Sequence, residues 1–262
     1  MGTTDLASFR SITVPAEHGG WSLTLEPAIL GLIVAPSAAG FAIAAAGLVA
    51  FIARTPLRVV LVDRYRERHL DRTSLARRAV AVEALVLVAL VTVAAVTAEG
   101  TWWPPLAPAA GLIAVELWYD VRSRSRRLVP EVAGTVGVSA LAASIALAGG
   151  SSATVAYGLW LAMAARAVAA VFFVRLQLRR AKGQPHRLAA SDLAQVITTG
   201  AVILAVGAGA LPLAAAFTIA ALGGAHIVLA RRRPPPAVVV GAQQVVFGLT
   251  VVLVIGLASV AP

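Results

Sequence analysis

The sequence predicts an all-α membrane protein, a polytopic bundle of about nine transmembrane helices. Of its 262 residues, 59% are hydrophobic and only 13% are charged, whereas a soluble domain carries roughly a quarter charged residues. The apolar residues are gathered in five long blocks, and most of the arginines lie between these blocks. A helix that spans a bilayer needs about 20 apolar residues, so four of the blocks are long enough for two spans each.

The five blocks give the helices in order. They are residues 21–53, 79–118, 132–173, 188–230 and 237–260. Each of the first four is interrupted by a short stretch that contains Gly, Pro or Ser, residues that favour turns. These interruptions are residues 35–37, 99–105, 149–152 and 207–212. Four hairpins and one final helix make nine spans.

The basic residues predict the orientation of these spans. Arginine-rich stretches separate the blocks at residues 54–78, 122–127, 175–187 and 231–233, and the interruptions inside the blocks carry no Lys or Arg. Short basic loops stay in the cytoplasm. We therefore expect residues 1–20 to be a cytoplasmic segment and residues 21–262 to form one transmembrane domain. This topology accounts for the net charge of +10 without a nucleic-acid partner, and the absence of Cys excludes disulfides and Cys-ligated zinc.

A candidate metal site follows the second predicted span. Asp63, Glu67 and Asp71 are spaced four residues apart, so in a helix their carboxylates share one face. Carboxylate oxygens suit a Mg²⁺ ion that also contacts a substrate phosphate. The alternative is a solvated helix in which neighbouring arginines neutralise the acids through pairs at a spacing of three residues. Both interpretations are open at this point.

A candidate phosphate site is formed by arginines that follow the fourth and sixth predicted spans. Guanidinium groups bind phosphate with two parallel hydrogen bonds, which makes Arg122, Arg126, Arg175 and Arg179 candidate substrate-binding residues. Asp120 precedes the first run and is a candidate acid or base. The alternative is a pair of loops that are basic only because they are cytoplasmic.

Arg166 is a further candidate substrate-binding residue because it lies well inside an apolar segment. A charge at this depth is costly and normally has an anionic partner in the bundle interior. The candidate partners within the protein are Glu26, Glu83 and Glu116. The interpretations are an anion-binding site and a structural ion pair.

The start of the first span contains Glu17 and His18 followed by two glycines. A Glu–His pair can transfer protons, and His can also bind a metal, so both residues are candidate catalytic groups. The alternative is an ordinary polar helix start.

A set of residues spread over most of the chain carries a family resemblance. They are Pro15, Glu17, His18, Gly19, Gly20, Trp21, Arg54, Pro56, Leu57, Tyr119, Asp120, Arg122, Arg126, Glu131, Arg166, Val174 and Arg175. In these residues the sequence resembles the YwiC-like family of bacterial membrane proteins. The resemblance implies a multi-pass protein of the bacterial cytoplasmic (inner) membrane.

Asp63, Glu67 and Asp71 carry a second resemblance. Together with nine spans and a cytoplasmic N-terminus, they are similar to the UbiA prenyltransferase superfamily, whose Asn/Asp-x-x-x-Asp-x-x-x-Asp motif binds Mg²⁺ and pyrophosphate after the second span. Glu67 replaces the middle Asp of that motif. The second acidic motif of the superfamily is replaced here by the arginine-rich residues 175–180. This resemblance implies an isoprenoid or lipid phosphate ligand held by Mg²⁺ and arginines.

Three functions are consistent with these features. The first is a UbiA-like enzyme or binder that acts on an isoprenoid or lipid phosphate at the cytoplasmic side of the lipid bilayer. The second is a transporter or channel for a small anionic or lipid substrate, with Arg166 as the intramembrane anion site. The third is a non-catalytic partner in a membrane complex.

Overall fold

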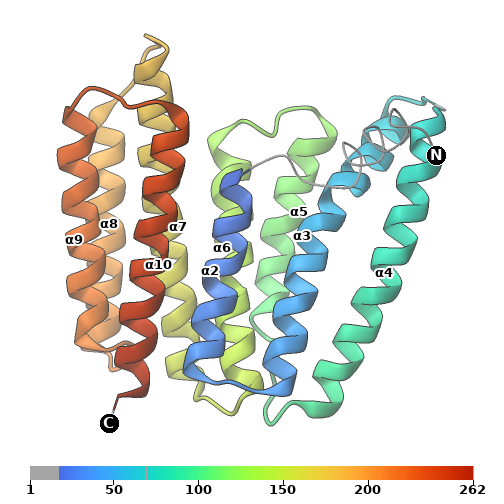
Figure 1. Cartoon of the computed structure of the whole chain (residues 1–262), viewed down its shortest axis with the longest axis horizontal. Coiled ribbons are helices and arrows are strands. Elements are labelled where there is room, and N and C mark those ends of the chain that lie inside the picture. Colours follow the sequence, from blue (N-terminus) through green and yellow to red (C-terminus); the bar gives the residue numbers. More distant parts are fainter. Residues whose placement is uncertain (1–17, 69, 262) are drawn as a thin grey trace.

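The described part of the chain, residues 18–68 and 70–261 of the computed structural model, forms nine α-helices and no strand. The helices are α2 (His18–Val34), α3 (Ala38–Tyr65), α4 (Asp71–Thr97), α5 (Leu106–Val121), α6 (Leu128–Ala148), α7 (Ala153–Ala181), α8 (Leu188–Gly207), α9 (Leu213–Arg231) and α10 (Ala237–Val260). Figure 1 shows them side by side in one bundle, with successive helices running in opposite directions. The predicted all-α fold class is confirmed.

The helices end and begin at the interruptions seen in the sequence. Ser37 caps the start of α3, because its hydroxyl accepts a hydrogen bond from the backbone N–H of Gly40 at 2.9 Å. Ser152 caps α7 in the same way. Between α6 and α7 the chain turns at Gly150, whose φ of +82° is a conformation that glycine adopts without strain. Local turn chemistry therefore explains why the blocks divide where they do.

Most of these helices have the dimensions of membrane spans. Seven of them, α3, α4 and α6 to α10, are long and apolar enough to cross a bilayer. The other two helices in the described residues are shorter, with 17 residues in α2 and 16 in α5. Both lie alongside the longer helices in Figure 1. The chain is therefore a multi-pass membrane protein whose nine described helices follow the predicted pattern.

The centre of the bundle is packed through small residues. Helix α2 contacts α3, α6, α7 and α10. A Cβ atom placed on Gly31 of α2 would lie 2.8 Å from Ile145 of α6, and one placed on Gly256 of α10 would lie 2.8 Å from Ile33 of α2. Small residues allow helices to approach closely inside a membrane, where packing replaces the hydrophobic effect as the source of association.

Helix α4 lies at the edge of the bundle and packs against α3 (Figure 1). Its most apolar stretch is only 6% buried within the protein. Val82, Leu85 and Val88 are exposed, as expected for side chains that face lipid.

Candidate functional site

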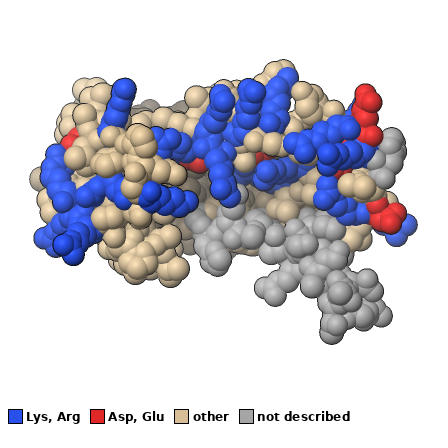
Figure 2. Space-filling model, turned by 90° about the horizontal axis from the view of Figure 1, so that it is seen from above, with Lys and Arg blue, Asp and Glu red and all other residues tan. Residues whose placement is uncertain are grey.

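The arginine-rich loops meet at one end of the bundle. The loops between α3 and α4, α5 and α6, α7 and α8, and α9 and α10 all lie at the top of Figure 1. Figure 2, which looks down on this end, shows Lys and Arg side chains spread across it with few acidic ones between them. We call this end the arginine-rich face; it comprises residues 64–68, 70–72, 122–127, 175–187 and 231–233. The prediction that the basic loops share one side is confirmed.

Arg122 is held by aromatic rings at this face. Its guanidinium carbon lies 3.4 Å from the centre of the Trp118 ring and 5.7 Å from that of Tyr65, distances typical of cation–π contacts. Arg66 donates a hydrogen bond of 2.7 Å to the hydroxyl of Ser123. The end of α3 and the loop between α5 and α6 are therefore joined at the position of Arg122.

The end of α7 reaches the same loop through Arg175. Its guanidinium donates hydrogen bonds to a carboxylate oxygen of Glu131 at 2.7 Å and to the backbone carbonyl of Arg126 at 3.1 Å. The Arg126 side chain is exposed beside this contact. Arg179 lies one turn further along α7 and is also exposed, with a 3.4 Å contact to the carbonyl of Pro185. The structure thus gathers Arg122, Arg126 and Arg175 around one loop, with Arg179 next to them along α7.

Asp120 lies beneath this arginine cluster and is fully buried. Its Oδ2 atom accepts hydrogen bonds from Nε and Nη2 of Arg54 at 3.1 and 3.0 Å, and Nη1 of Arg54 lies 2.9 Å from Glu116. A Cβ atom on Gly134 of α6 would overlap the Glu116 carboxylate, so this glycine makes room for it. Arg54, which the sequence analysis did not assign to a site, therefore holds two carboxylates.

The structure corrects the expected arrangement of Asp63, Glu67 and Asp71. Helix α3 ends at Tyr65, Glu67 has a left-handed φ of +53°, and α4 begins at Asp71. Asp63, Glu67 and Asp71 therefore do not share one helix face, since the chain reverses direction between them. Both the metal-site interpretation and the solvated-helix interpretation assumed one continuous helix, and that assumption is wrong. The acid–arginine pairs three residues apart that such a helix would form are wrong with it.

The carboxylate of Asp63 is instead used to close this hairpin. It is buried and accepts hydrogen bonds from Arg72 at 3.0 Å and from the hydroxyl of Thr73 at 2.6 Å. Glu67 and Asp71 are exposed. No group of three or more His, Asp or Glu residues suited to a metal ion occurs in the part of the chain that the structure describes. Asp63, Glu67 and Asp71 are therefore not among such groups in the described structure, and the magnesium site stays a prediction.

The side chains of two candidate catalytic residues lie outside the described residues. Glu17 lies outside the described residues, and His18 begins α2 with a side chain that is also outside the described set. Their proposed role in proton transfer stays a prediction.

Arg166 has the anionic partner that its depth in the membrane requires. Its Nη2 atom lies 3.3 Å from Oε1 of Glu26 and 2.6 Å from the backbone carbonyl of Gln244. Arg166 is 1% exposed and Glu26 is 2% exposed. Ser22, one turn before Glu26, donates a 2.5 Å hydrogen bond to the same carboxylate oxygen. Of the three predicted partners, Glu26 is the one found, and it joins α2 to α7.

A buried hydrogen-bond chain continues from Gln244 across three helices. Nε2 of Gln244 lies 3.1 Å from Nε2 of His226, whose Nδ1 lies 3.1 Å from Oε1 of Gln195. Gln195 in turn donates to the carbonyl of Ala169 at 3.0 Å. Because an amide nitrogen only donates, this network assigns the neutral His226 tautomer with its proton on Nδ1.

The sequence analysis missed His226 and Gln195. Each is a single polar residue in its own apolar segment, and no spacing along the chain links α8, α9 and α10 at these positions. A lone polar residue in an apolar span is the available signal, since such residues bond across helices in membranes.

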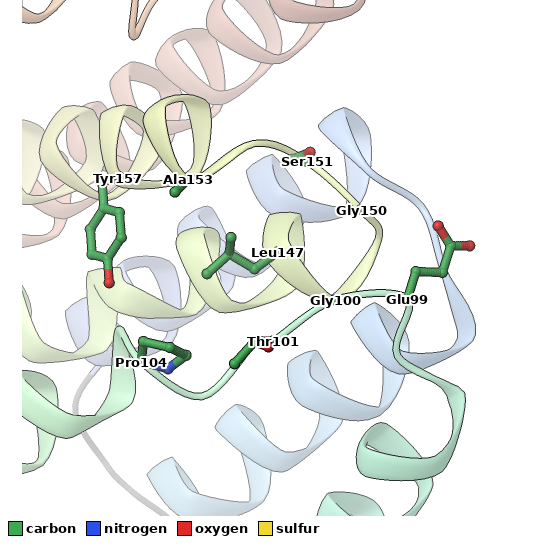
Figure 3. A pocket seen from close by; sticks show the side chains of 9 residues that line it. All are labelled: Glu99, Gly100, Thr101, Pro104, Leu147, Gly150, Ser151, Ala153 and Tyr157. Atoms are coloured by element: carbon green, nitrogen blue, oxygen red, sulfur yellow. The ribbon is translucent and has the colours of Figure 1, made fainter.

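A small cavity lies at the end of the bundle opposite the arginine-rich face. It has a volume of about 430 Å³ and is lined by the loops before α5 and α7. Figure 3 shows Glu99 at one edge and Tyr157 at the other. No residue that the sequence analysis assigned to a site lines this cavity.

Comparison with known proteins identifies one family. The family model described as YwiC-like protein matches residues 14–146, just over half of the chain. The match covers α2 to α5 and nearly all of α6, and so includes Glu26, Arg54, Asp120, Arg122 and Arg126. No curated protein and no solved structure matches the chain. The chain belongs to the YwiC-like protein family.

Proposed function

We propose that this protein binds an isoprenoid or other lipid phosphate at the arginine-rich face, as a UbiA-like binder or enzyme of the bacterial inner membrane. The arginine-rich face is cytoplasmic in this proposal. The observation that carries it is the convergence of Arg122, Arg126 and Arg175 around the loop between α5 and α6, at one end of an apolar bundle.

The charges around this loop support an anionic ligand. Glu131 neutralises Arg175, and the nearby Asp120 is already paired with Arg54. Arg66, Arg122 and Arg126 are left without a carboxylate partner among the described residues. Guanidinium groups bind phosphate through charge-assisted hydrogen bonds, and a basic residue near a membrane surface adds about 1 kcal/mol to the binding of an anionic lipid.

The aromatic residues at the site support a ligand with a lipid tail. Trp118 and Tyr65 are exposed next to Arg122, and such rings prefer the boundary between headgroups and hydrocarbon. A phosphate held at Arg122 would place its tail alongside the apolar helices. If the ligand is also converted, the same arginines would stabilise a departing pyrophosphate, and Asp120 is the candidate acid or base.

The experiment is a binding titration of purified protein in nanodiscs made of zwitterionic lipid. The probe is geranylgeranyl phosphate, and binding is measured by native mass spectrometry. The variant Arg122→Ala/Arg126→Ala is expected to bind about 30-fold more weakly, because two contacts of about 1 kcal/mol each are lost. Geranylgeraniol, which lacks the phosphate, is expected to bind no better to the wild type than to this variant.

The matched control is Arg77→Ala/Arg78→Ala. These two arginines are exposed on α4 near the same end of the bundle, so the control removes the same charge from a different place. It is expected to keep wild-type affinity. Equal weakening in both variants, or a wild type that does not bind the phosphate, would contradict the proposal.

A further inference from the structure

Hydrogen-bonding atoms without partners gather around Arg166. In the described residues, seven buried side-chain N or O atoms lack a hydrogen-bond partner, and four of them belong to this site. They are Nε and Nη1 of Arg166, Oε2 of Glu26 and Oε1 of Gln244. Most of the unsatisfied atoms therefore lie where α2, α7 and α10 meet.

Buried polar atoms without hydrogen-bond partners are especially unfavourable in a membrane. An unsatisfied buried polar group is destabilising and a charged one more so, and no bulk water reaches the hydrocarbon region to compensate. The neighbouring groups on the side of His226 do not help, because Nε2 of Gln244, both ring nitrogens of His226 and the Gln195 amide are already hydrogen-bonded in one chain. A molecule that occupies the site would satisfy the remaining atoms.

The unsatisfied atoms define the chemistry of that molecule. Nε and Nη1 of Arg166 offer three N–H donors, whereas Glu26 and Gln244 offer acceptors. The charges of Arg166 and Glu26 balance each other. An anion would only accept hydrogen bonds and would be repelled by Glu26, and a cation would be repelled by Arg166. The fitting group is neutral and both donates and accepts.

We infer that α2, α7 and α10 enclose an intramembrane binding site for a neutral hydroxyl group, in contact with Arg166, Glu26 and Gln244. The hydroxyl comes from water molecules or from the alcohol group of a lipid. The site is independent of the phosphate site proposed above. Gly248 of α10 lies against this site: a Cβ atom there would overlap the Glu26 carboxylate, so the glycine leaves room for that carboxylate.

Met163 is a natural reporter for water at this site. It lies one turn before Arg166 in α7, is only 2% exposed, and belongs to the same core cluster as Leu30 of α2 and Val251 of α10. Apart from Met1 it is the only methionine in the chain. A methionine is readily oxidised, so radicals formed from a buried water molecule would oxidise Met163 despite its burial.

The experiment is X-ray radiolytic footprinting of the protein in nanodiscs, with oxidation measured by mass spectrometry. Phe173 is the internal reference, because it is 0% exposed and stacks on His226, on the side where the polar groups are satisfied. If the hydroxyl is water, Met163 is oxidised well above Phe173 in the wild type. The variant Glu26→Leu/Arg166→Leu removes the donors and acceptors, and its Met163 oxidation is expected to fall to the Phe173 level.

A second arm detects a lipid alcohol. Native mass spectrometry of the wild type is then expected to show a bound neutral lipid that the Glu26→Leu/Arg166→Leu variant lacks. Oxidation of Met163 or a retained alcohol supports the inference and identifies the source of the hydroxyl. A wild type in which Met163 is protected and no neutral lipid is retained overturns it. The wild-type measurements decide the question even if the double variant does not fold.

Discussion

Arg166 of α7 and Glu26 of α2 form an ion pair, 3.3 Å between Nη2 and Oε1, in which both side chains are at least 98% buried. The two residues are 140 positions apart in the sequence. Their contact joins α2 to α7. It also balances the charge of Arg166, which would be unfavourable on its own in the bilayer interior.

Breaking this pair on one side is expected to be severe. Arg166→Leu leaves Glu26 as an uncompensated buried charge, which costs about 3–5 kcal/mol of unfolding free energy. Glu26→Leu/Arg166→Leu removes both charges and is expected to recover much of that loss. The measurement is SDS-induced unfolding in mixed micelles, followed by tryptophan fluorescence. A double variant as unstable as the single one would show that the pair is not the cause.

Gly248→Ala is expected to destabilise the protein although it adds one methyl group. The new Cβ atom would overlap the Glu26 carboxylate, and forcing extra volume into a packed interior costs about 1–3 kcal/mol. Gly241→Ala on the same helix is the control, since nothing lies within 4 Å of its Cβ position. Thermal unfolding of both variants is compared with the wild type. The explanation fails if the two substitutions have the same effect.

The Asp63 hydrogen bonds lead to a prediction about magnesium. Asp63→Asn weakens the contacts with Arg72 and Thr73 and is expected to cost about 1–3 kcal/mol. Glu67→Gln/Asp71→Asn changes two exposed side chains and is expected to be close to neutral. If Asp63 serves only to close the hairpin, excess Mg²⁺ or EDTA leaves the unfolding midpoint of the wild type unchanged. A midpoint that rises with Mg²⁺ and depends on Glu67 and Asp71 would instead establish the metal site.

The absence of cysteine from the sequence allows a clean test of orientation. Single cysteines are introduced by Ser125→Cys at the arginine-rich face and by Ser151→Cys at the opposite end. A membrane-impermeant maleimide applied to intact cells is expected to label Ser151→Cys, and to label Ser125→Cys only after the inner membrane is permeabilised. This pattern is expected because the positive-inside rule places Arg-rich loops in the cytoplasm. The opposite labelling pattern would show that the protein has the reverse orientation.

The amino-acid sequence alone determined the number of helices, the turns that divide the apolar blocks into hairpins, and the side on which the arginines lie. Span length, turn-forming residues such as Ser37 and Gly150, and loop charge are local properties, so they can be read without a partner. The need of Arg166 for an anionic partner was also visible, because a charge inside an apolar run is unfavourable wherever the helix packs.

Only the tertiary structure decided which polar groups meet. Glu26 with Arg166, Asp120 with Arg54, and Gln195 with His226 are each on different helices and 31 or more residues apart. In a segment that is apolar on all sides, periodicity does not reveal how the helix is rotated. The prediction that Asp63, Glu67 and Asp71 share one helix face was wrong for a related reason. A regular spacing of four predicts a shared face only while the helix continues, and this helix ends at Tyr65.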